Sequence, residues 1–287
     1  MEREIGRTGV RVYPVGWGVM PLSTRSTRPE RGDALAVFKA ALDAGVTFWD
    51  TADSYCLNDK ETGHNERLIA WAIARLGVAG RVVVATKGGM VRPRGSWLMN
   101  GRPEHLKHAC EASLKALGVE QIFLYQFHWP DPNVPYAESI GAMAELQREG
   151  KVRHIGISNV TAAQLRQAQE IVRVETVQNR CNPTDAGDFS SGLVASCAQQ
   201  GVTYIPYSPL GGGSGYRQMG RQRLLSELGQ AHGVSAYRVA LAWLLAKGPN
   251  VVPIPGASQV ASITDSAAAA QLTLSDEELR RIDALGR

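Results

Sequence analysis

The sequence predicts a closed (β/α)8 barrel, because short β-rich runs alternate with longer amphipathic runs along most of its 287 residues. Several short runs, such as VVVATK and IFLYQF, are almost continuously apolar, which is typical of strands covered on both faces. An open doubly wound sheet is the main alternative, but Gly16-Trp-Gly18 lacks the third glycine of its dinucleotide fingerprint. We therefore expect an α/β barrel that forms a single domain over residues 1–287.

Eight strands and eight helices are expected, with each strand followed by its helix. The strands are predicted at 15–17, 47–50, 81–87, 122–128, 152–158, 176–179, 203–207 and 251–254. The helices are predicted at 31–44, 64–76, 103–117, 137–149, 161–171, 187–199, 235–246 and 259–269. Residues 4–12 predict a β-hairpin around a glycine-bearing turn, ahead of the first barrel strand. Ser275, followed by acidic residues, predicts the N-cap of a closing C-terminal helix.

The composition is that of an ordinary globular chain, with 44% hydrophobic and 20% charged residues. The formal charge of +4 is not concentrated, and the basic run 217–223 is expected to be solvated loop surface, so no nucleic-acid partner is expected. No run approaches the length of a membrane span and no signal peptide is recognised, so we expect a cytoplasmic protein without a membrane partner. The cysteines, at positions 56, 110, 181 and 197, are far apart, so neither disulfides nor a metal site are expected.

Ionisable side chains lie where three consecutive strands are predicted to end. They are Asp50 and the following Tyr55 at the second strand, Lys87 at the third and His128 at the fourth. Each one has an ordinary structural explanation, such as a turn cap, rim packing, a solvated turn residue or a buried core histidine. Active sites of (β/α)8 barrels form at the C-terminal ends of the strands, so we expect these four mouth residues to converge.

The chemistry of the four mouth residues is complementary. A phenol titrates near pH ~10, so it donates a proton poorly at neutral pH unless its surroundings help. The ammonium of Lys87 would lower the pKa of Tyr55, and Asp50 would orient that ammonium. His128 would hydrogen-bond a substrate carbonyl oxygen. The expected result is an acid that protonates an oxygen while it gains negative charge.

In the contexts FWDTADSY, VVATKGG and YQFHWPDP, these residues resemble the tetrad of the aldo-keto reductases. The likeness covers essentially the whole chain, and it implies that the N-terminal hairpin closes the bottom of the barrel. It continues in family order through HIGISNV, VQNRCNP, YIPYSPLGGG and VVPIPGAS. It implies an NAD(P)H-dependent oxidoreductase that reduces aldehyde or ketone carbonyls by hydride transfer, with Tyr55 as the proton donor. The pattern is also similar to bacterial reductases that include pyridoxal reductases, which makes pyridoxal a candidate substrate.

The resemblance implies NADP bound in an extended form across the barrel mouth, with NAD as the open alternative. The residues implied near the nicotinamide and the reacting carbon are Gly18, Val19, Met20, Ser158, Asn159, Gln178 and Tyr207. Those implied near the pyrophosphate are Ser208, Leu210 and Gly211, and those implied at the adenosine end are Ser258, Gln259, Ser262, Asp265 and Ser266. The segment 255–266 contains no cation, which weakens the expectation of a bound 2′-phosphate.

Trp17, Met20 and Trp129 are expected to line an apolar mouth that takes a small-molecule carbonyl substrate, although core or rim packing explains each equally well. The segments 56–65 and 90–97 are candidates for a lid or for plain surface. Two other classes of function fit the fold: a cofactor-binding regulatory subunit, like potassium-channel β subunits, and a phosphate-handling barrel enzyme. The intact tetrad argues against the first, and the second would leave the tetrad as a coincidence.

Overall fold

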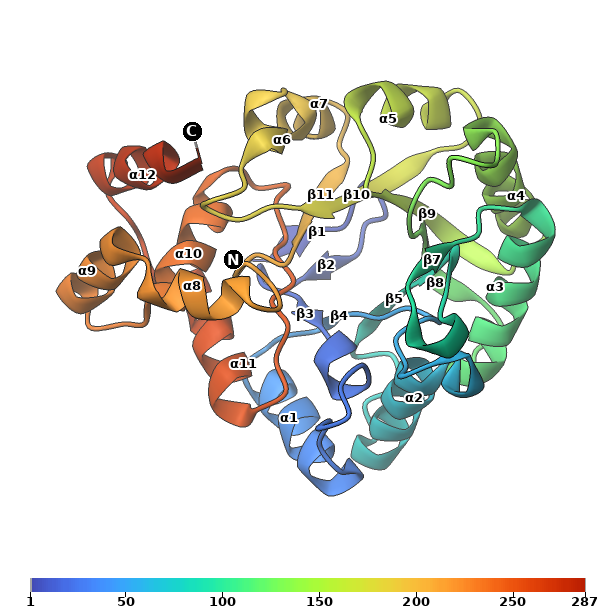
Figure 1. Ribbon diagram of the computed structural model, residues 1–287, viewed down its shortest axis with the longest axis horizontal. Helices are drawn as coiled ribbons and strands as arrows, with labels where there is room; N and C mark the ends of the chain where they lie inside the picture. The colour runs from blue at the N-terminus through green and yellow to red at the C-terminus, as the bar shows by residue number, and fades with distance from the viewer. Residues whose placement is uncertain (1, 287) are drawn as a thin grey trace.

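The computed structural model describes residues 2–286 and is organised around seven parallel strands in the order β11-β10-β9-β8-β5-β4-β3 (Figure 1). They are β3 (Trp17–Gly18), β4 (Phe48–Asp50), β5 (Val83–Gly88), β8 (Ile122–Phe127), β9 (Val152–Ser158), β10 (Val174–Arg180) and β11 (Thr203–Tyr207). Helices surround this ring of strands (Figure 1). The predicted α/β barrel is confirmed, while positions 1 and 287 of the expected domain lie outside the described residues.

The eighth strand, predicted over 251–254, closes the ring through isolated bridges instead of a regular strand. On one side, the N–H groups of Val252 and Ile254 donate to β11 at 2.9 and 3.1 Å. On the other side, two N–H groups from the β3 segment donate to the carbonyls of Pro253 and Pro255 at 2.9 and 3.1 Å. The two prolines have no N–H to return, so the ladder toward β3 stays incomplete.

The helices around the ring agree with the prediction to within a few residues. They are α1 (Arg31–Asp43), α2 (His64–Leu76), α3 (Pro103–Leu117), α4 (Tyr136–Arg148), α5 (Ala162–Gln169), α10 (Ala236–Ala246) and α11 (Val260–Ala267). The helix predicted at 187–199 is divided into α6 (Gly187–Ser190) and α7 (Leu193–Gln199), because Gly192 between them has a left-handed φ of 79°. Within residues 2–286, no helix is both long and apolar enough to cross a membrane.

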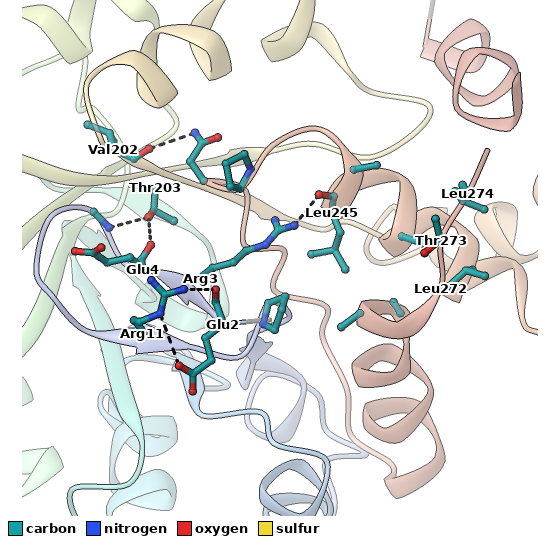
Figure 2. Close-up of a pocket in the computed structure, with 18 of the residues that line it drawn as sticks. Glu2, Arg3, Glu4, Arg11, Val202, Thr203, Leu245, Leu272, Thr273 and Leu274 are labelled. Carbon is teal, nitrogen blue, oxygen red and sulfur yellow. Dashed lines mark hydrogen bonds and ion pairs between the residues drawn. The ribbon is translucent and has the colours of Figure 1, made fainter. Parts of the chain in front are cut away.

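The predicted hairpin and C-terminal helix are both present. Strands β1 (Arg3–Glu4) and β2 (Arg11–Val12) pair antiparallel, and Thr203 at the start of β11 donates to the backbone oxygen of Glu4 at 2.9 Å. Arg3 donates to the backbone oxygen of Val251. It also donates to the backbone oxygen of Leu245 at 2.7 Å, which ties the hairpin to the end of α10 (Figure 2). The hairpin therefore covers the end of the barrel opposite the mouth.

Helix α12 (Asp276–Asp283) has Ser275 as its N-cap residue, as predicted. The Ser275 hydroxyl accepts from the N–H of Glu278, and the Glu278 carboxylate accepts from the N–H of Ser275. This reciprocal capping box satisfies two backbone donors that the first turn of a helix leaves without partners.

The basic run 217–223 is solvated as expected, since Arg217, Arg221 and Arg223 are exposed, but it is not a loop. The run lies on α8 (Gly215–Arg221) and α9 (Arg223–His232), where Met219, Leu225 and Leu228 are buried. The Gln222 side chain caps α9 by accepting from the N–H of Leu225. A second feature that the prediction lacked is the small hairpin formed by β6 (Met90–Val91) and β7 (Leu98–Met99).

The period of two along each strand places polar side chains above an apolar barrel interior. Phe48, Ala85 and Leu124 belong to the cluster that fills the barrel. Two positions further along the same strands stand Asp50, Lys87 and Gln126. Alternate residues of a strand share one face, so these three point inward as well, one layer nearer the mouth.

Gly156 lies where a side chain would collide with this polar layer. An added Cβ would stand 2.2 Å from Thr176 Oγ1 and 2.8 Å from Gln126 Cγ. We expect Gly156→Ala to lower the free energy of unfolding by about 1–3 kcal/mol, measured by urea denaturation. The control is Gly141→Ala in α4, where a Cβ meets nothing within 4 Å, and it should raise stability by about 0.5–1 kcal/mol. Equal stabilities for the two variants would contradict this packing.

Candidate active site

The structure brings the four mouth residues together. Lys87 Nζ donates to Asp50 Oδ1 at 2.5 Å, to the Tyr55 hydroxyl at 3.1 Å and to the backbone oxygen of Thr51 at 2.8 Å. The rings of Tyr55 and His128 meet edge to face, with centroids 5.7 Å apart. All four side chains are buried, and that of Lys87 is completely inaccessible to solvent.

Backbone hydrogen bonds hold the loop that carries Tyr55 against the neighbouring strand. The N–H of Thr51 donates to the carbonyl of Ala85 at 2.8 Å, and that of Asp53 donates to the carbonyl of Lys87 at 3.3 Å. The parallel ladder between β4 and β5 thus continues past the end of β4. This continuation delivers Tyr55 to the lysine that it contacts.

Two glutamines complete the environment of Asp50. Gln126 and Gln178 each donate from Nε2 to Asp50 Oδ2 at 2.9 Å, and Gln178 also donates to Gln126 Oε1 at 3.1 Å. Sequence reasoning missed Gln126, although an amide inside the otherwise apolar run IFLYQF was a visible signal. Gln178, expected near the nicotinamide, directs its amide nitrogen to the carboxylate of Asp50.

Lys87 lowers the pKa of Tyr55 as expected, but another effect is larger. Burial raises the pKa of Tyr55, Lys87 lowers it by less, and the net shift is upward. For Lys87, burial lowers the pKa, but the charges and hydrogen bonds of Asp50 and Tyr55 raise it above its usual value. Tyr55 therefore keeps its proton and Lys87 stays an ammonium at neutral pH.

His128 is neutral for a related reason. Burial lowers its pKa well below the usual range, and the positive charge of Lys87 lowers it further. Its Nδ1 is buried without a hydrogen-bond partner among residues 2–286. A neutral imidazole has one N–H to donate, which is what a carbonyl oxygen at the mouth requires.

Beside the four mouth residues lies a cleft that extends along the segment following β11. Besides Asp50 and Tyr55, it is lined by Gly18, Met20, Pro21, Thr24, Arg25, Tyr207, Ser208, Pro209, Leu210, Gly212, Gly213, Tyr216, Ile254 and Gly256. The cleft wall therefore includes Gly18, Met20, Tyr207, Ser208 and Leu210 from the expected cofactor set. Left-handed φ values of 48° at Ser208 and 87°, 61° and 47° at residues 211–213 curl the segment tightly. Such consecutive bends leave backbone N–H groups available to an anion.

Asn159 connects the mouth to this cleft. Its side chain donates to the backbone oxygen of His128 and to Ser158 Oγ, each at 3.0 Å, and accepts from the Tyr207 hydroxyl at 2.7 Å. Ser158 in turn donates to the backbone oxygen of Gln178 at 2.6 Å. These expected cofactor residues therefore form one hydrogen-bonded chain beside His128.

Two residues expected at the mouth face the other way. Trp17 and Val19 are fully buried in the cluster that packs β3 against α1. Trp17 Nε1 donates to the backbone oxygen of Ala257 at 3.1 Å, and its ring lies 4.9 Å from that of Phe38. The alternation along the strand puts Gly18 on the cleft side and its two neighbours on the helix side. Trp17 is therefore not a lining residue of the mouth.

At the expected adenosine end, Asp265 is already engaged. Its carboxylate accepts from Ser235 Oγ at 2.5 Å and from the Arg238 guanidinium at 2.7 Å. Ser266 is buried, whereas Ser258 and Ser262 are partly exposed and Gln259 is exposed. Arg238 on α10 lies beside α11 and carries the positive charge that residues 255–266 lack. The sequence of that segment alone could not reveal it.

The mouth carries several exposed apolar side chains. Trp97 is 41% exposed and its ring stands edge to face against Tyr55, with centroids 6.3 Å apart. Met20 lines the cleft, and Trp129, which follows His128, is also exposed. These side chains give the opening an apolar rim.

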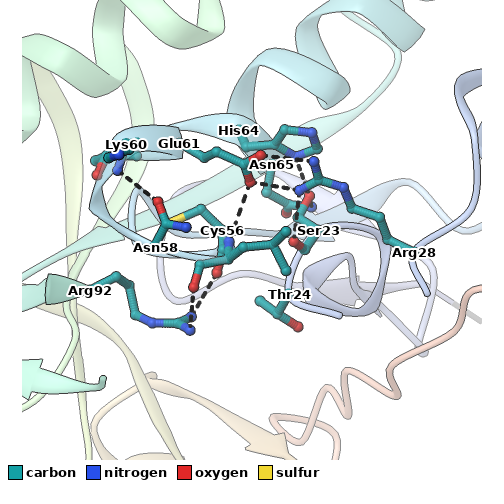
Figure 3. A network of polar contacts seen from close by, with 12 residues as sticks. Ser23, Thr24, Arg28, Cys56, Asn58, Lys60, Glu61, His64, Asn65 and Arg92 are labelled. Atoms are coloured by element: carbon teal, nitrogen blue, oxygen red, sulfur yellow. Dashed lines mark hydrogen bonds and ion pairs between the residues drawn. The ribbon is translucent and has the colours of Figure 1, made fainter. Parts of the chain in front are cut away.

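The segment 56–65 is tied down by polar contacts. Arg28 pairs with both carboxylate oxygens of Glu61, at 2.7 and 2.9 Å, and donates to the backbone oxygen of Ser23, which joins the loop after β3 to the loop after β4 (Figure 3). The hydrogen bond from Arg28 lowers the pKa of Glu61 to about 2. Cys56, next to Tyr55, is buried, and burial raises the pKa of its thiol to about 11, which leaves it unreactive at neutral pH.

These features define an α/β-barrel enzyme whose acid–base site adjoins a glycine-rich cleft. The chain belongs to the aldo/keto reductase family, whose sequence profile matches residues 14–287. It is 32% identical to probable aldo-keto reductase 1 of Glycine max, over 97% of this chain and 87% of that protein. It is also 32% identical to the 6-dehydroglucose reductase of Novosphingobium aromaticivorans, over 93% of this chain and 89% of that protein.

Solved structures give the same result. A thermostable aldo-keto reductase in complex with the inhibitor epalrestat is 32% identical, with a TM-score of 0.83 and 100% of both chains covered. An aldo/keto reductase from Klebsiella pneumoniae in complex with NADP and acetate is 25% identical, with a TM-score of 0.82 and coverage of 99% and 94%. The prediction of an NAD(P)-dependent oxidoreductase is confirmed. No cluster of side chains suited to holding a metal ion occurs in the described part of the chain.

The buried pair of Lys87 and Asp50 makes a prediction about stability. Lys87→Met leaves a buried carboxylate without its cation and should lower the free energy of unfolding by about 3–5 kcal/mol. Adding Asp50→Asn removes that charge and should recover part of the loss. Urea denaturation near neutral pH measures both variants. A double variant less stable than the single one would contradict this account of the pair.

His128 makes a prediction about pH. Its folded-state pKa lies well below the usual 6.5, so the unfolded chain binds more protons as the pH falls below that value. The free energy of unfolding should therefore fall below about pH 6.5, with His128 contributing up to about 1.4 kcal/mol per pH unit. His128→Gln should show a shallower decrease in the same denaturation series. Identical slopes for the wild type and the variant would contradict the buried neutral state.

Proposed function

We propose that this protein reduces aldehyde or ketone carbonyls of small molecules to alcohols, with NADPH as the reductant and Tyr55 as the proton donor. The observation that carries this proposal is the hydrogen bond of 3.1 Å between Lys87 Nζ and the Tyr55 hydroxyl, next to the buried ion pair with Asp50. A phenol coupled to a buried ammonium suits proton donation to an oxygen. Asp50, Tyr55, Lys87 and His128 are the proposed catalytic residues.

The cleft has the features that a nicotinamide dinucleotide requires, since it starts at Tyr55 and follows the curled glycine-rich segment. When bound, the coenzyme supplies the hydride. The residues proposed to hold it are Gly18, Met20, Ser158, Asn159, Gln178, Tyr207, Ser208, Leu210 and Gly211, with Ser258, Gln259 and Ser262 at the adenosine end. The complexes of the Klebsiella pneumoniae relatives with NADP and with NADPH favour NADP over NAD. Arg238 lies beside this end, where its charge is already paired with that of Asp265.

The catalytic residues divide the work. Neutral His128 donates a hydrogen bond to the substrate carbonyl oxygen and holds it toward Tyr55. Tyr55 transfers its proton to this oxygen as negative charge develops there. Lys87 then stabilises the phenolate, while Asp50 and its two glutamine donors keep the ammonium in position. The buried site excludes water, which strengthens each of these interactions.

A cofactor-binding regulatory subunit is the alternative function. It would require the cleft but not the buried assembly of Lys87, Asp50 and Tyr55, and the structure contains that assembly in full. A small panel of carbonyl compounds addresses the substrate: pyridoxal, a nitrobenzaldehyde, methylglyoxal, a diketone and an oxidised sugar.

Tyr55→Phe removes the proposed proton donor and leaves the cleft intact. We expect its turnover with this panel to fall by roughly 100-fold or more, while its affinity for NADPH stays unchanged. Turnover is followed through the absorbance of NADPH, with NADH in parallel, and affinity is followed by fluorescence quenching. The matched control is Tyr13→Phe, which removes a hydroxyl bonded to the backbone of Ala267, away from the mouth. Unchanged turnover in Tyr55→Phe would exclude this mechanism.

A further inference from the structure

Arg92 lies between β6 and β7 and is almost completely buried, with 6% of its surface exposed. Its guanidinium donates to the backbone oxygens of Cys56 and Gly95 at 2.8 Å, Leu57 at 3.1 Å and Ser54 at 3.5 Å. Figure 3 shows its head directed at the loop of Cys56. Three of these four acceptors flank Tyr55 in the sequence.

The backbone of Arg92 holds the same loop from a second point. Its carbonyl accepts from the N–H of Asp59 at 2.9 Å and from that of Gly95 at 3.0 Å. Main chain and side chain together therefore fix the stretch 54–59, which contains the proposed proton donor.

The guanidinium also supports the aromatic ring that stands against Tyr55. The Arg92 guanidinium carbon lies 3.8 Å from the centroid of the Trp97 ring. That indole meets the Tyr55 ring edge to face. Stacking of this kind fixes the angle of a half-exposed indole that would otherwise be free to rotate. Tyr55 is thus braced through its own loop and through its aromatic neighbour.

The chemistry of Arg92 is unusual for a residue with only a packing role. None of the ion pairs formed within residues 2–286 includes it, so a buried cation is neutralised here by carbonyl dipoles alone. Removing a guanidinium from water is costly, and an apolar side chain would fill the same space at less cost. A planar group with five donors is needed where several carbonyls and one ring must be fixed together.

We propose that Arg92 is a positioning residue for the reaction: through the loop 54–59 and through Trp97 it sets the place of the Tyr55 hydroxyl between Lys87 and His128. This inference rests on the proposed function, in which Tyr55 donates the proton. Arg92 itself does not contact the reacting atoms. Its loss would leave the proton donor present but poorly placed, and misplacement by about 1 Å is enough to cost roughly 100-fold in rate.

The test compares the full-length wild type with Arg92→Met and Arg92→Lys. In Arg92→Met we expect amide hydrogen exchange across 54–59 to become about tenfold faster or more, kcat to fall by about 10- to 100-fold, and the Kd for NADPH to change by less than about twofold. The exchange rate and kcat of Arg92→Lys should lie between those of the wild type and Arg92→Met, because an ammonium replaces some of the hydrogen bonds but cannot stack as a planar group. Arg3→Met is the matched control, since Arg3 also donates to two backbone oxygens but lies at the opposite end of the barrel.

A structural role alone would change thermal stability and exchange but not kcat, so an unchanged kcat in Arg92→Met overturns the proposal. Unchanged exchange across 54–59 overturns it as well. The double variant with Trp97→Leu should lose less activity than the two single losses multiplied together, because both act through Tyr55. Should the wild type turn over no carbonyl compound, the proposed function fails, while the exchange measurement still decides whether Arg92 fixes the Tyr55 loop.

Discussion

The buried ion pair between Lys87 and Asp50 is the interaction on which the rest of the site depends. Both side chains have left water almost completely, and such a pair is stable only when its remaining donors and acceptors are also satisfied. Thr51, Tyr55 and two glutamines provide those contacts, and they come from the loop after β4 and from strands β8 and β10. Strands β4, β5, β8 and β10 must therefore be assembled in their correct register before the pair is fully satisfied. Fold and chemistry are coupled at this point.

The same burial sets the protonation state of each mouth residue. It keeps the proton on Tyr55 and removes any charge from His128, while the counter-charge of Asp50 keeps Lys87 ionised. One effect, the loss of water, thus has opposite consequences for an acid and for a base. The mouth holds one neutral acid, one neutral hydrogen-bond donor and one cation, which is the combination that protonation of a carbonyl oxygen requires.

The architecture and the convergence at the mouth could be predicted because both follow from local patterns. Apolar runs revealed most strands, and the end of each run located Asp50, Lys87 and His128. Trp17 faces the helices because side chains alternate along β3. A strand of two residues is too short for the sequence to show which of its side chains face the barrel interior. The net shift of the Tyr55 pKa depends on burial, which no local pattern contains.

Other features were hidden because their causes are not local in sequence. Arg238 reaches Asp265 from the neighbouring helix, 27 positions away. Helices α8 and α9 follow a glycine-rich segment, and their few apolar residues did not form a periodic run long enough to recognise. The bond from Arg92 to the Cys56 backbone oxygen spans 36 positions, so the support of the Tyr55 loop appears only in three dimensions.

The incomplete ladder at the eighth strand position has a consequence for motion. In the ladders between β5 and β8 and between β8 and β9, neighbouring strands exchange hydrogen bonds in both directions, whereas Pro253 and Pro255 can only accept those of Gly16 and Gly18. Two backbone hydrogen bonds join the segments at this seam, fewer than in the longer ladders between β5 and β8 and between β8 and β9. Gly18 and Gly256, on either side of the seam, also line the cleft. The barrel is thus weakly bonded along the line where a long, extended molecule would need room to enter and to leave.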